Sequence, residues 1–172
     1  NDPKTSEIRW RCCAFDALSV AELDAIYRAR QLVFIIEQAC AYLDADGVDP
    51  KSWHLAAWSA AQPEPLAYAR LVAPGVKYAE ASIGRVITSA AARGTGLGRE
   101  LVRRAVIEAE ALYPGSGLRI SAQAHLARFY AGFGFASVGE EYLEDNIPHI
   151  EMLRPPGMFL AFIGQVSMPS IV

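Results

Sequence analysis

Cysteine is scarce in this 172-residue sequence, and its placement excludes several kinds of site. The three cysteines are Cys12, Cys13 and Cys40, two of which are adjacent, and no Cys-x-x-Cys or Cys/His pair has the spacing of metal ligands. A disulfide between neighbouring residues is strained. We therefore expect three free thiols that pack as small apolar side chains in a reducing compartment, and no metal site.

Strong net charge and long apolar runs are also missing. The chain has 16 Lys and Arg against 19 Asp and Glu, and this net charge of −3 argues against a nucleic-acid-binding surface. No apolar run approaches the roughly 18 to 20 residues that a membrane span needs. The polar segment 1–7 has no apolar core typical of a signal peptide. We expect a cytoplasmic protein that binds neither nucleic acid nor membrane.

The amino-acid composition fits one globular domain, because 52% of the residues are hydrophobic and only 20% are charged. We expect this domain to span residues 8–154, after the polar segment 1–7. The tail 155–172 is apolar from Met158 onward, and it is expected to pack on the domain or on a second copy in a homodimer.

Hydrophobic periodicity predicts strands that alternate with helices. Three helices are expected, at 20–38, 96–113 and 125–132. The expected strands are 8–15, 53–59, 66–72, 80–88, 118–123, 135–138 and 147–153, with an acidic turn at 140–146. This order predicts an α/β fold with a mixed central sheet and helices on both faces.

The most informative stretch is the glycine-rich segment from Thr88 to Arg99, which follows a strand and opens the second helix. Gly94, Gly96 and Gly98 allow positive φ angles and close approach of a ligand, so several N–H groups can face one phosphate. A dinucleotide fingerprint is excluded because Arg99 occupies its third glycine position, and no P-loop sequence occurs.

The pattern Arg93-x-x-Gly96-x-Gly98 is instead similar to the acetyl-CoA pyrophosphate loop of the GNAT acetyltransferase superfamily. The segment 128–135 resembles a later motif of that family, a helix carrying a Tyr before a Gly-Phe ending. Further segments look like its ElaA-like branch, and they lie at 34–38, 42–47, 69–71, 83–86, 122–125 and 144–149. The resemblance covers about residues 8–154.

This resemblance implies a GNAT fold and direct transfer of an acetyl group from acetyl-CoA to a primary amine. No acyl-enzyme is implied, and no cysteine lies in a His-paired nucleophile motif. The resemblance places the pantetheine against main-chain groups of Val86 and Ile87. For the pyrophosphate it implies the loop residues Arg93, Gly94, Thr95, Gly96, Leu97, Gly98 and Arg99.

Tyr130 matches the family's general acid, which protonates the departing thiolate. An alternative is that Tyr130 is a core residue beside Phe129 and Phe133. The general base is open. His125 lies at a strand-to-helix junction, and histidine is a residue type suited to proton transfer near neutral pH. The alternatives are Glu37, Glu80, His149 and His54.

The acceptor site is equally open. Asp44, Asp46, Glu144 and Asp145 either attract a cationic amine or form a solvated acidic rim. Arg30, Arg70 and Arg85 either bind a substrate carboxylate or pair with Glu37. Arg85 alternates with Ile83 and Ile87, which predicts that the three share one strand face. Glu37, Arg85 and Asp145 are the candidate acceptor-binding residues.

Two other functions remain open from the sequence: a catalytically silent module that senses acyl-CoA, and a structural interaction domain. The acceptor, too, is left among a small amine, an amino acid, a peptide N-terminus and a lysine side chain.

Overall fold

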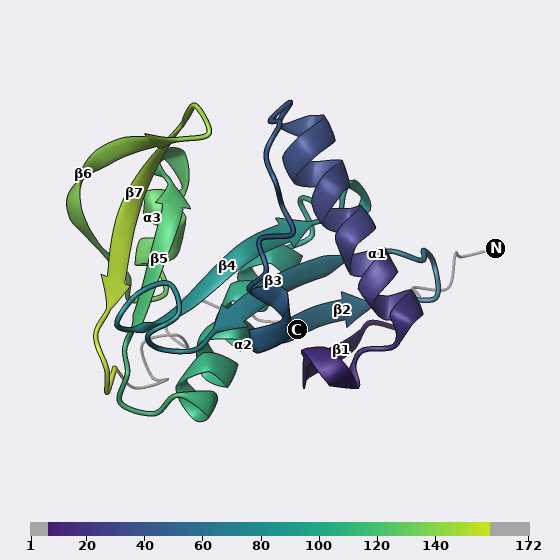
Figure 1. Ribbon diagram of the computed structural model, residues 1–172, viewed down its shortest axis with the longest axis horizontal. Coiled ribbons are helices and arrows are strands. Elements are labelled where there is room, and N and C mark those ends of the chain that lie inside the picture. Colours follow the sequence, from purple (N-terminus) through teal and green to yellow (C-terminus); the bar gives the residue numbers. More distant parts are fainter. Residues whose placement is uncertain (1–6, 159–172) are drawn as a thin grey trace, which may run out of the picture.

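The computed structural model describes residues 7–158 and contains one seven-stranded mixed sheet (Figure 1). The sheet order is β1-β2-β3-β4-β5-β7-β6. The strands are β1 (Arg9–Ala14), β2 (Trp53–Trp58), β3 (Ala67–Val72), β4 (Ala81–Thr88), β5 (Leu118–Gln123), β6 (Ala136–Glu144) and β7 (Ile147–Arg154). The predicted α/β class is confirmed. The tail expected to pack on the domain or on a second copy lies, from residue 159, outside the described residues.

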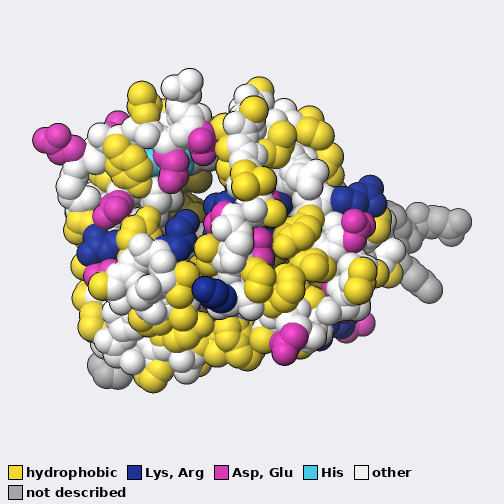
Figure 2. Space-filling view, in the orientation of Figure 1, with side chains coloured by type: hydrophobic (Ala, Val, Ile, Leu, Met, Phe, Trp, Pro, Cys, Tyr) yellow, Lys and Arg dark blue, Asp and Glu magenta, His cyan; other side chains and the backbone are white. Residues whose placement is uncertain are grey.

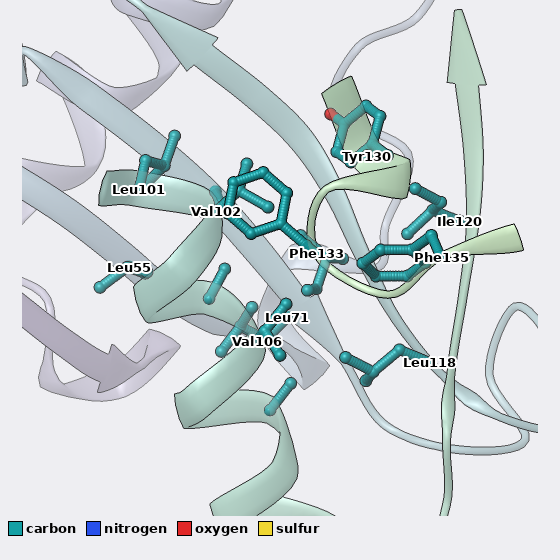
Figure 3. Packing of buried hydrophobic residues seen from close by; sticks show 14 of the residues in the cluster. Leu55, Leu71, Leu101, Val102, Val106, Leu118, Ile120, Tyr130, Phe133 and Phe135 are labelled. Atoms are coloured by element: carbon teal, nitrogen blue, oxygen red, sulfur yellow. The ribbon is translucent and has the colours of Figure 1, made fainter. Parts of the chain in front are cut away.

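Helices cover both faces of the sheet, as expected. Helix α1 (Val20–Arg30) packs Ile26 and Ala29 on Ala56 and Tyr68 of one face. Helix α2 (Leu97–Leu112) and the short α3 (Ala127–Ala131) cover the opposite face. In Figure 3, Leu101, Val102 and Val106 of α2 lie over the strands, with Phe133 and Phe135 beside them. None of the helices in residues 7–158 is long and apolar enough to cross a membrane.

The helix predicted over 20–38 begins as expected but changes its geometry halfway. Ser19 caps α1 by accepting a hydrogen bond from the Glu22 N–H. From Gln31 to Glu37 the chain continues as a π-helix, η2. Five successive apolar residues at 32–36 cannot all face one side of a regular α-helix, and Leu32 and Ile36 are indeed exposed.

Strand β4 contains a bulge at the position that organises the site. Tyr68 pairs with Ile87 and Arg70 with Gly84, so two residues of β4 oppose one residue of β3. Arg85, within the bulge, has a φ of +50°. The extra residue reverses the alternation, so Ile83 packs on the α2 face and Ile87 on the α1 face. The prediction that Ile83, Arg85 and Ile87 share one face is therefore wrong.

The sheet divides between β4 and β5. These strands are parallel and pair only at their first residues, through Ala81 with Leu118 and Ser82 with Arg119. Figure 1 shows the two halves fanning apart beyond this point. The second half is completed by β6, which runs on to Glu144, because the stretch predicted as an acidic turn is mostly strand. The turn itself is Asp145 and Asn146, both at positive φ.

Candidate functional site

A cavity of about 300 Å³ occupies the region where β4 and β5 separate. In the space-filling view this face is hollowed beside the β6–β7 hairpin, with basic and acidic side chains at the floor (Figure 2). Its lining comes from β3, β4, β5, the β6–β7 hairpin, η2 and α3, and from the loops after η2 and before β4. The lining residues used below are Tyr42, Lys77, Arg85, Val86, Ser121, Tyr130, Glu144, Asp145 and His149.

A network of three arginines and three aspartates lies at and beneath the floor of the cavity, and its members Asp46, Arg70 and Arg85 line the cavity. Arg30 donates to Asp44 at 2.8 Å and to Asp49 at 2.7 Å, and its side chain is wholly buried. Arg70 donates to Asp46 at 2.7 Å and to Asp49 at 3.0 Å. The suggested pairing of Arg30 with Glu37 is therefore wrong, because the loop before β2 supplies the counter-ions.

Two aspartates of this network, Asp46 and Asp49, are stabilised as anions. Burial alone would raise the pKa of Asp46, but hydrogen bonds from Arg70 and the Val48 N–H outweigh it and hold that pKa well below its usual range. The pKa of Asp49 is lowered in the same way, burial being outweighed by Arg30 and Arg70. Asp44 and Asp46 are thus neutralised within the fold, which argues against their predicted role as free attractors of a cationic amine.

Arg85 connects this floor to the cavity. Its Nε donates to Asp44 at 2.8 Å, and its guanidinium lies 5.6 Å from the centre of the Tyr42 ring. The side chain is 17% exposed and lines the cavity, so it remains a candidate for binding an acceptor. The positive φ of Arg85 is held by these contacts, since a non-glycine residue adopts that conformation only when its surroundings enforce it.

Acidic and hydroxyl groups form the opposite wall. Glu144 and Asp145 lie at the end of the β6–β7 hairpin and line the cavity with Ser121 of β5 and His149 of β7. The Ser121 hydroxyl bonds the Tyr142 hydroxyl and donates to Glu144 at 3.4 Å. His149 contacts Glu144 through Nε2 at 3.3 Å. This wall carries the acidic groups that remain available to attract a cation.

Tyr130 lies at the inner side of the cavity. It belongs to α3, is 8% exposed, and packs edge-on against Phe129 and Phe135. Figure 3 shows the ring of Tyr130 near that of Phe135. Burial raises the pKa of Tyr130 to about 12, so the phenol stays protonated at neutral pH. The two readings of Tyr130 from the sequence are thus compatible, because its ring is part of the core while the residue lines the cavity.

The glycine-rich loop continues from the far end of β4 into α2. Gly94 and Gly96 have φ angles of +78° and +83°, and open space surrounds the position of a Cβ at each. Gly96 is the N-cap of α2, with no side-chain cap, so the first N–H groups of a 16-residue helix face outward. Gly98 lacks a positive φ, contrary to expectation, and lies within the first turn.

Two further predicted residues meet at this loop. Arg93 donates to Glu37 at 2.6 Å, and both side chains are exposed. Glu37 is therefore brought to the loop, and it does not line the cavity as an acceptor-binding residue would. Of the two strand residues expected to contact pantetheine, Val86 lines the cavity, whereas Ile87 is buried against α1.

The candidate bases lie in different surroundings. His125 is exposed, in the 3-10 turn η5 (Ala124–Leu126), and is not among the cavity-lining residues. His54 is buried, bonded to the Tyr68 hydroxyl and the Asp49 carbonyl, and burial lowers its pKa. Glu80 pairs with Arg119. Among the five candidates, only His149 lines the cavity.

Lys77, Tyr78 and Ser121 are polar lining residues that were not predicted from the sequence. Lys77 and Tyr78 lie in the loop before β4, where no periodic pattern indicates which side chains turn inward. Partial burial, together with Arg70 and Arg85, lowers the pKa of Lys77. Ser121 was predicted to lie in a strand, but the residue pattern of that strand does not indicate that it borders a cavity.

Comparisons with known proteins agree on one family. A family model described as "Acetyltransferase (GNAT) domain" matches residues 57–154. Protein ElaA of Escherichia coli is 39% identical over 149 residues, which cover 86% of this chain and 96% of that protein. A UPF0039 protein of Synechocystis is 46% identical over 147 residues, covering 86% of this chain and 95% of that protein.

Solved structures give the same result. The crystal structure of an acyl-CoA N-acyltransferase from Pseudomonas aeruginosa matches with a TM-score of 0.81 and 43% identity, over 86% of this chain and 99% of that one. The crystal structure of Escherichia coli ElaA matches with a TM-score of 0.80 and 38% identity, over the same shares of the two chains.

Proposed function

The chain belongs to the GNAT acetyltransferase family, in its ElaA-like branch, and from this premise we propose that it transfers an acetyl group from acetyl-CoA to a primary amine. The observation that carries the proposal is the opening between β4 and β5. The cavity in this opening is lined by Tyr130, and β4, which borders it, leads on through the glycine-rich loop to the uncapped N-terminus of α2. An elongated donor that ends in a thioester suits such a path.

The donor's pyrophosphate would be held by the loop at 93–99. The open N–H groups at the start of α2 and the helix dipole favour an anion there, and Arg93 and Arg99 add charge. The open space around Gly94 and Gly96 lets a phosphate approach the backbone. Main-chain groups of Val86, within the bulge, would hydrogen-bond the pantetheine amides as two neighbouring strands bond each other.

Acetyl-CoA supplies an activated thioester, and the protein's residues orient it and manage protons. Tyr130 is proposed to donate a proton to the departing thiolate. Because burial keeps its phenol protonated, the group is available as an acid near neutral pH. Its place in the core fixes the direction of the hydroxyl.

The acceptor is proposed to enter along the wall formed by the β6–β7 hairpin. Glu144 and Asp145 would attract its ammonium group, and Arg85 on the floor would bind a carboxylate if the acceptor carries one. A small amine, an amino acid, a peptide N-terminus and a lysine side chain all meet this description. The three cysteines are free thiols, which supports the proposed cytoplasmic location.

The test is a turnover assay with acetyl-CoA and a panel of primary amines, read as release of free thiol, with calorimetric binding of CoA measured in parallel. We expect binding and amine-dependent thiol release. Binding without release for any amine would overturn the proposal in favour of an acyl-CoA sensor. Failure to bind CoA would leave an interaction domain.

A further inference from the structure

His149 occupies a fixed position in the wall that the acceptor would face. It lies on β7 opposite Gln123 of β5 and Tyr142 of β6, and it is 9% exposed. Its Nδ1 is 2.7 Å from the carbonyl oxygen of Ile147. A carbonyl only accepts hydrogen bonds, so Nδ1 carries the hydrogen and Nε2 is the nitrogen free to take up a proton.

A carboxylate lies beside Nε2. Glu144 Oε2 lies 3.3 Å from it, so proton uptake there creates an ion pair with this carboxylate. Glu144 is held in turn by the Ser121 hydroxyl, which also bonds Tyr142. The Tyr142 ring stacks on the imidazole with their centres 6.2 Å apart. The contacts with Glu144 and with the Tyr142 ring therefore fix the orientation of the His149 ring.

The other candidate bases are engaged elsewhere or face away. Glu37 is paired with Arg93, Glu80 with Arg119, and His54 is bonded through both ring nitrogens. His125 is exposed on η5. His149 therefore combines a lining position with a basic Nε2 that lies beside the Glu144 carboxylate.

We propose that His149 Nε2 accepts the proton from the acceptor's ammonium group, with Glu144 as the positioning residue. This inference rests on the proposed transfer to an amine. His149 takes one proton from R–NH3⁺, and the neutral nitrogen then bonds to the thioester carbonyl carbon. As the C–S bond breaks, sulfur receives a proton from Tyr130, and the nitrogen loses a second proton that restores the phenol. One proton in all is released to solvent.

Several titratable groups line the cavity with His149 or lie on its own or a neighbouring strand, and they bear on any pH dependence. They are Glu144 and Tyr142 of β6, Asp145 of the turn, Glu151 of β7, Lys77 and Tyr78 of the loop before β4, and Cys40 of the loop after η2. Burial raises the pKa of Tyr78 to about 12 and raises that of Tyr142, so both are neutral in the range where a histidine titrates.

The test compares pH profiles of kcat/KM for the wild type and His149→Asn, with an alkylamine as the acceptor. An asparagine side-chain amide can still donate to the Ile147 carbonyl, so the hairpin is retained while the basic nitrogen is lost. We expect turnover to fall about 10²–10⁴-fold and the acidic limb of the profile to disappear. CoA affinity, measured by calorimetry, should be unchanged.

An acceptor that is already neutral at the assay pH, such as an alkoxyamine, supplies the decisive contrast. The defect of His149→Asn should shrink at least tenfold with it, because no proton has to be removed before attack. Glu144→Gln should move the acidic limb to lower pH, and Glu144→Asp should restore part of it. Glu141→Gln, a change at an exposed residue of the same strand, should behave as the wild type.

The outcomes are distinguishable. If the wild type acetylates no amine, the proposed function fails and this inference fails with it. If the wild type acetylates amines while His149→Asn keeps the acidic limb, or has the same defect with both acceptors, only the role of His149 is overturned. The role is also overturned if His125→Asn removes the limb and His149→Asn does not.

Discussion

Arg30 Nη1 lies 2.7 Å from Asp49 Oδ1, and the two side chains are only 0% and 1% exposed. Removing one member of a buried ion pair leaves an uncompensated charge, which typically costs about 3–5 kcal/mol. Arg30→Met should therefore lower the free energy of unfolding by about that amount in a denaturant titration. Arg28, which pairs with Glu64 and is 59% exposed, is the control, and Arg28→Ala should cost about 1 kcal/mol or less.

A second prediction concerns acid stability. The pKa of Asp46 in the folded protein is held below its ordinary value of about 4. The unfolded chain therefore binds the proton more readily, so this stabilisation is present above pH 4 and is lost as the pH falls. Asp46→Asn should lower the free energy of unfolding at pH 7 and leave it less dependent on pH between 5 and 2 than in the wild type. Denaturant titrations at several pH values measure this, and parallel curves for the two proteins would contradict it.

A third prediction is that a large side chain in the glycine-rich loop blocks binding of the donor. Gly96→Trp should weaken CoA binding at least tenfold, because the indole would fill the open space in front of the first N–H groups of α2. Gly139→Trp is a matched control, since Gly139 has nearly the same φ, +81°, with equally open surroundings on β6. It should carry a similar conformational cost yet bind CoA normally. Equal CoA affinity of both variants in calorimetry would remove the loop from the donor site.

Tyr130→Phe tests the proposed acid. The phenyl ring keeps the packing on Phe129 and Phe135, so the fold and CoA affinity should be retained. The turnover number should fall about 10²-fold or more if the hydroxyl protonates the thiolate. Tyr113→Phe, at a half-buried tyrosine that is not among the cavity-lining residues, should turn over acetyl-CoA as the wild type does. An unimpaired Tyr130→Phe enzyme would exclude this role.

The parts of the fold that could be predicted are those fixed by local pattern. Helix α2 repeats Leu101, Val102, Ala105, Val106 and Ala109 at helical spacing, and all five are buried. The strand, glycine turn and helix start around Gly96 follow from residue types that permit little else. These elements lie where the sequence placed them, within one or two residues.

The features that were mispredicted depend on contacts between distant segments. Arg85 adopts a positive φ because Asp44, far away in the sequence, holds its guanidinium, and nothing local indicates the bulge. The turn predicted at 140–146 is largely strand because β6 is paired with β7, although its side chains are mostly exposed. His149 faces the cavity because of its register against β5, which sequence spacing does not reveal.

The central claim is acetyl transfer to an amine, and the most direct measurement follows both products at once. The wild-type protein would be incubated with acetyl-CoA and each amine, and CoA and acetylated amine quantified by mass spectrometry. For at least one amine, the account predicts an N-acetylated product in an amount equal to the CoA released. CoA release without an acetylated amine, or neither product in the presence of bound acetyl-CoA, would contradict it.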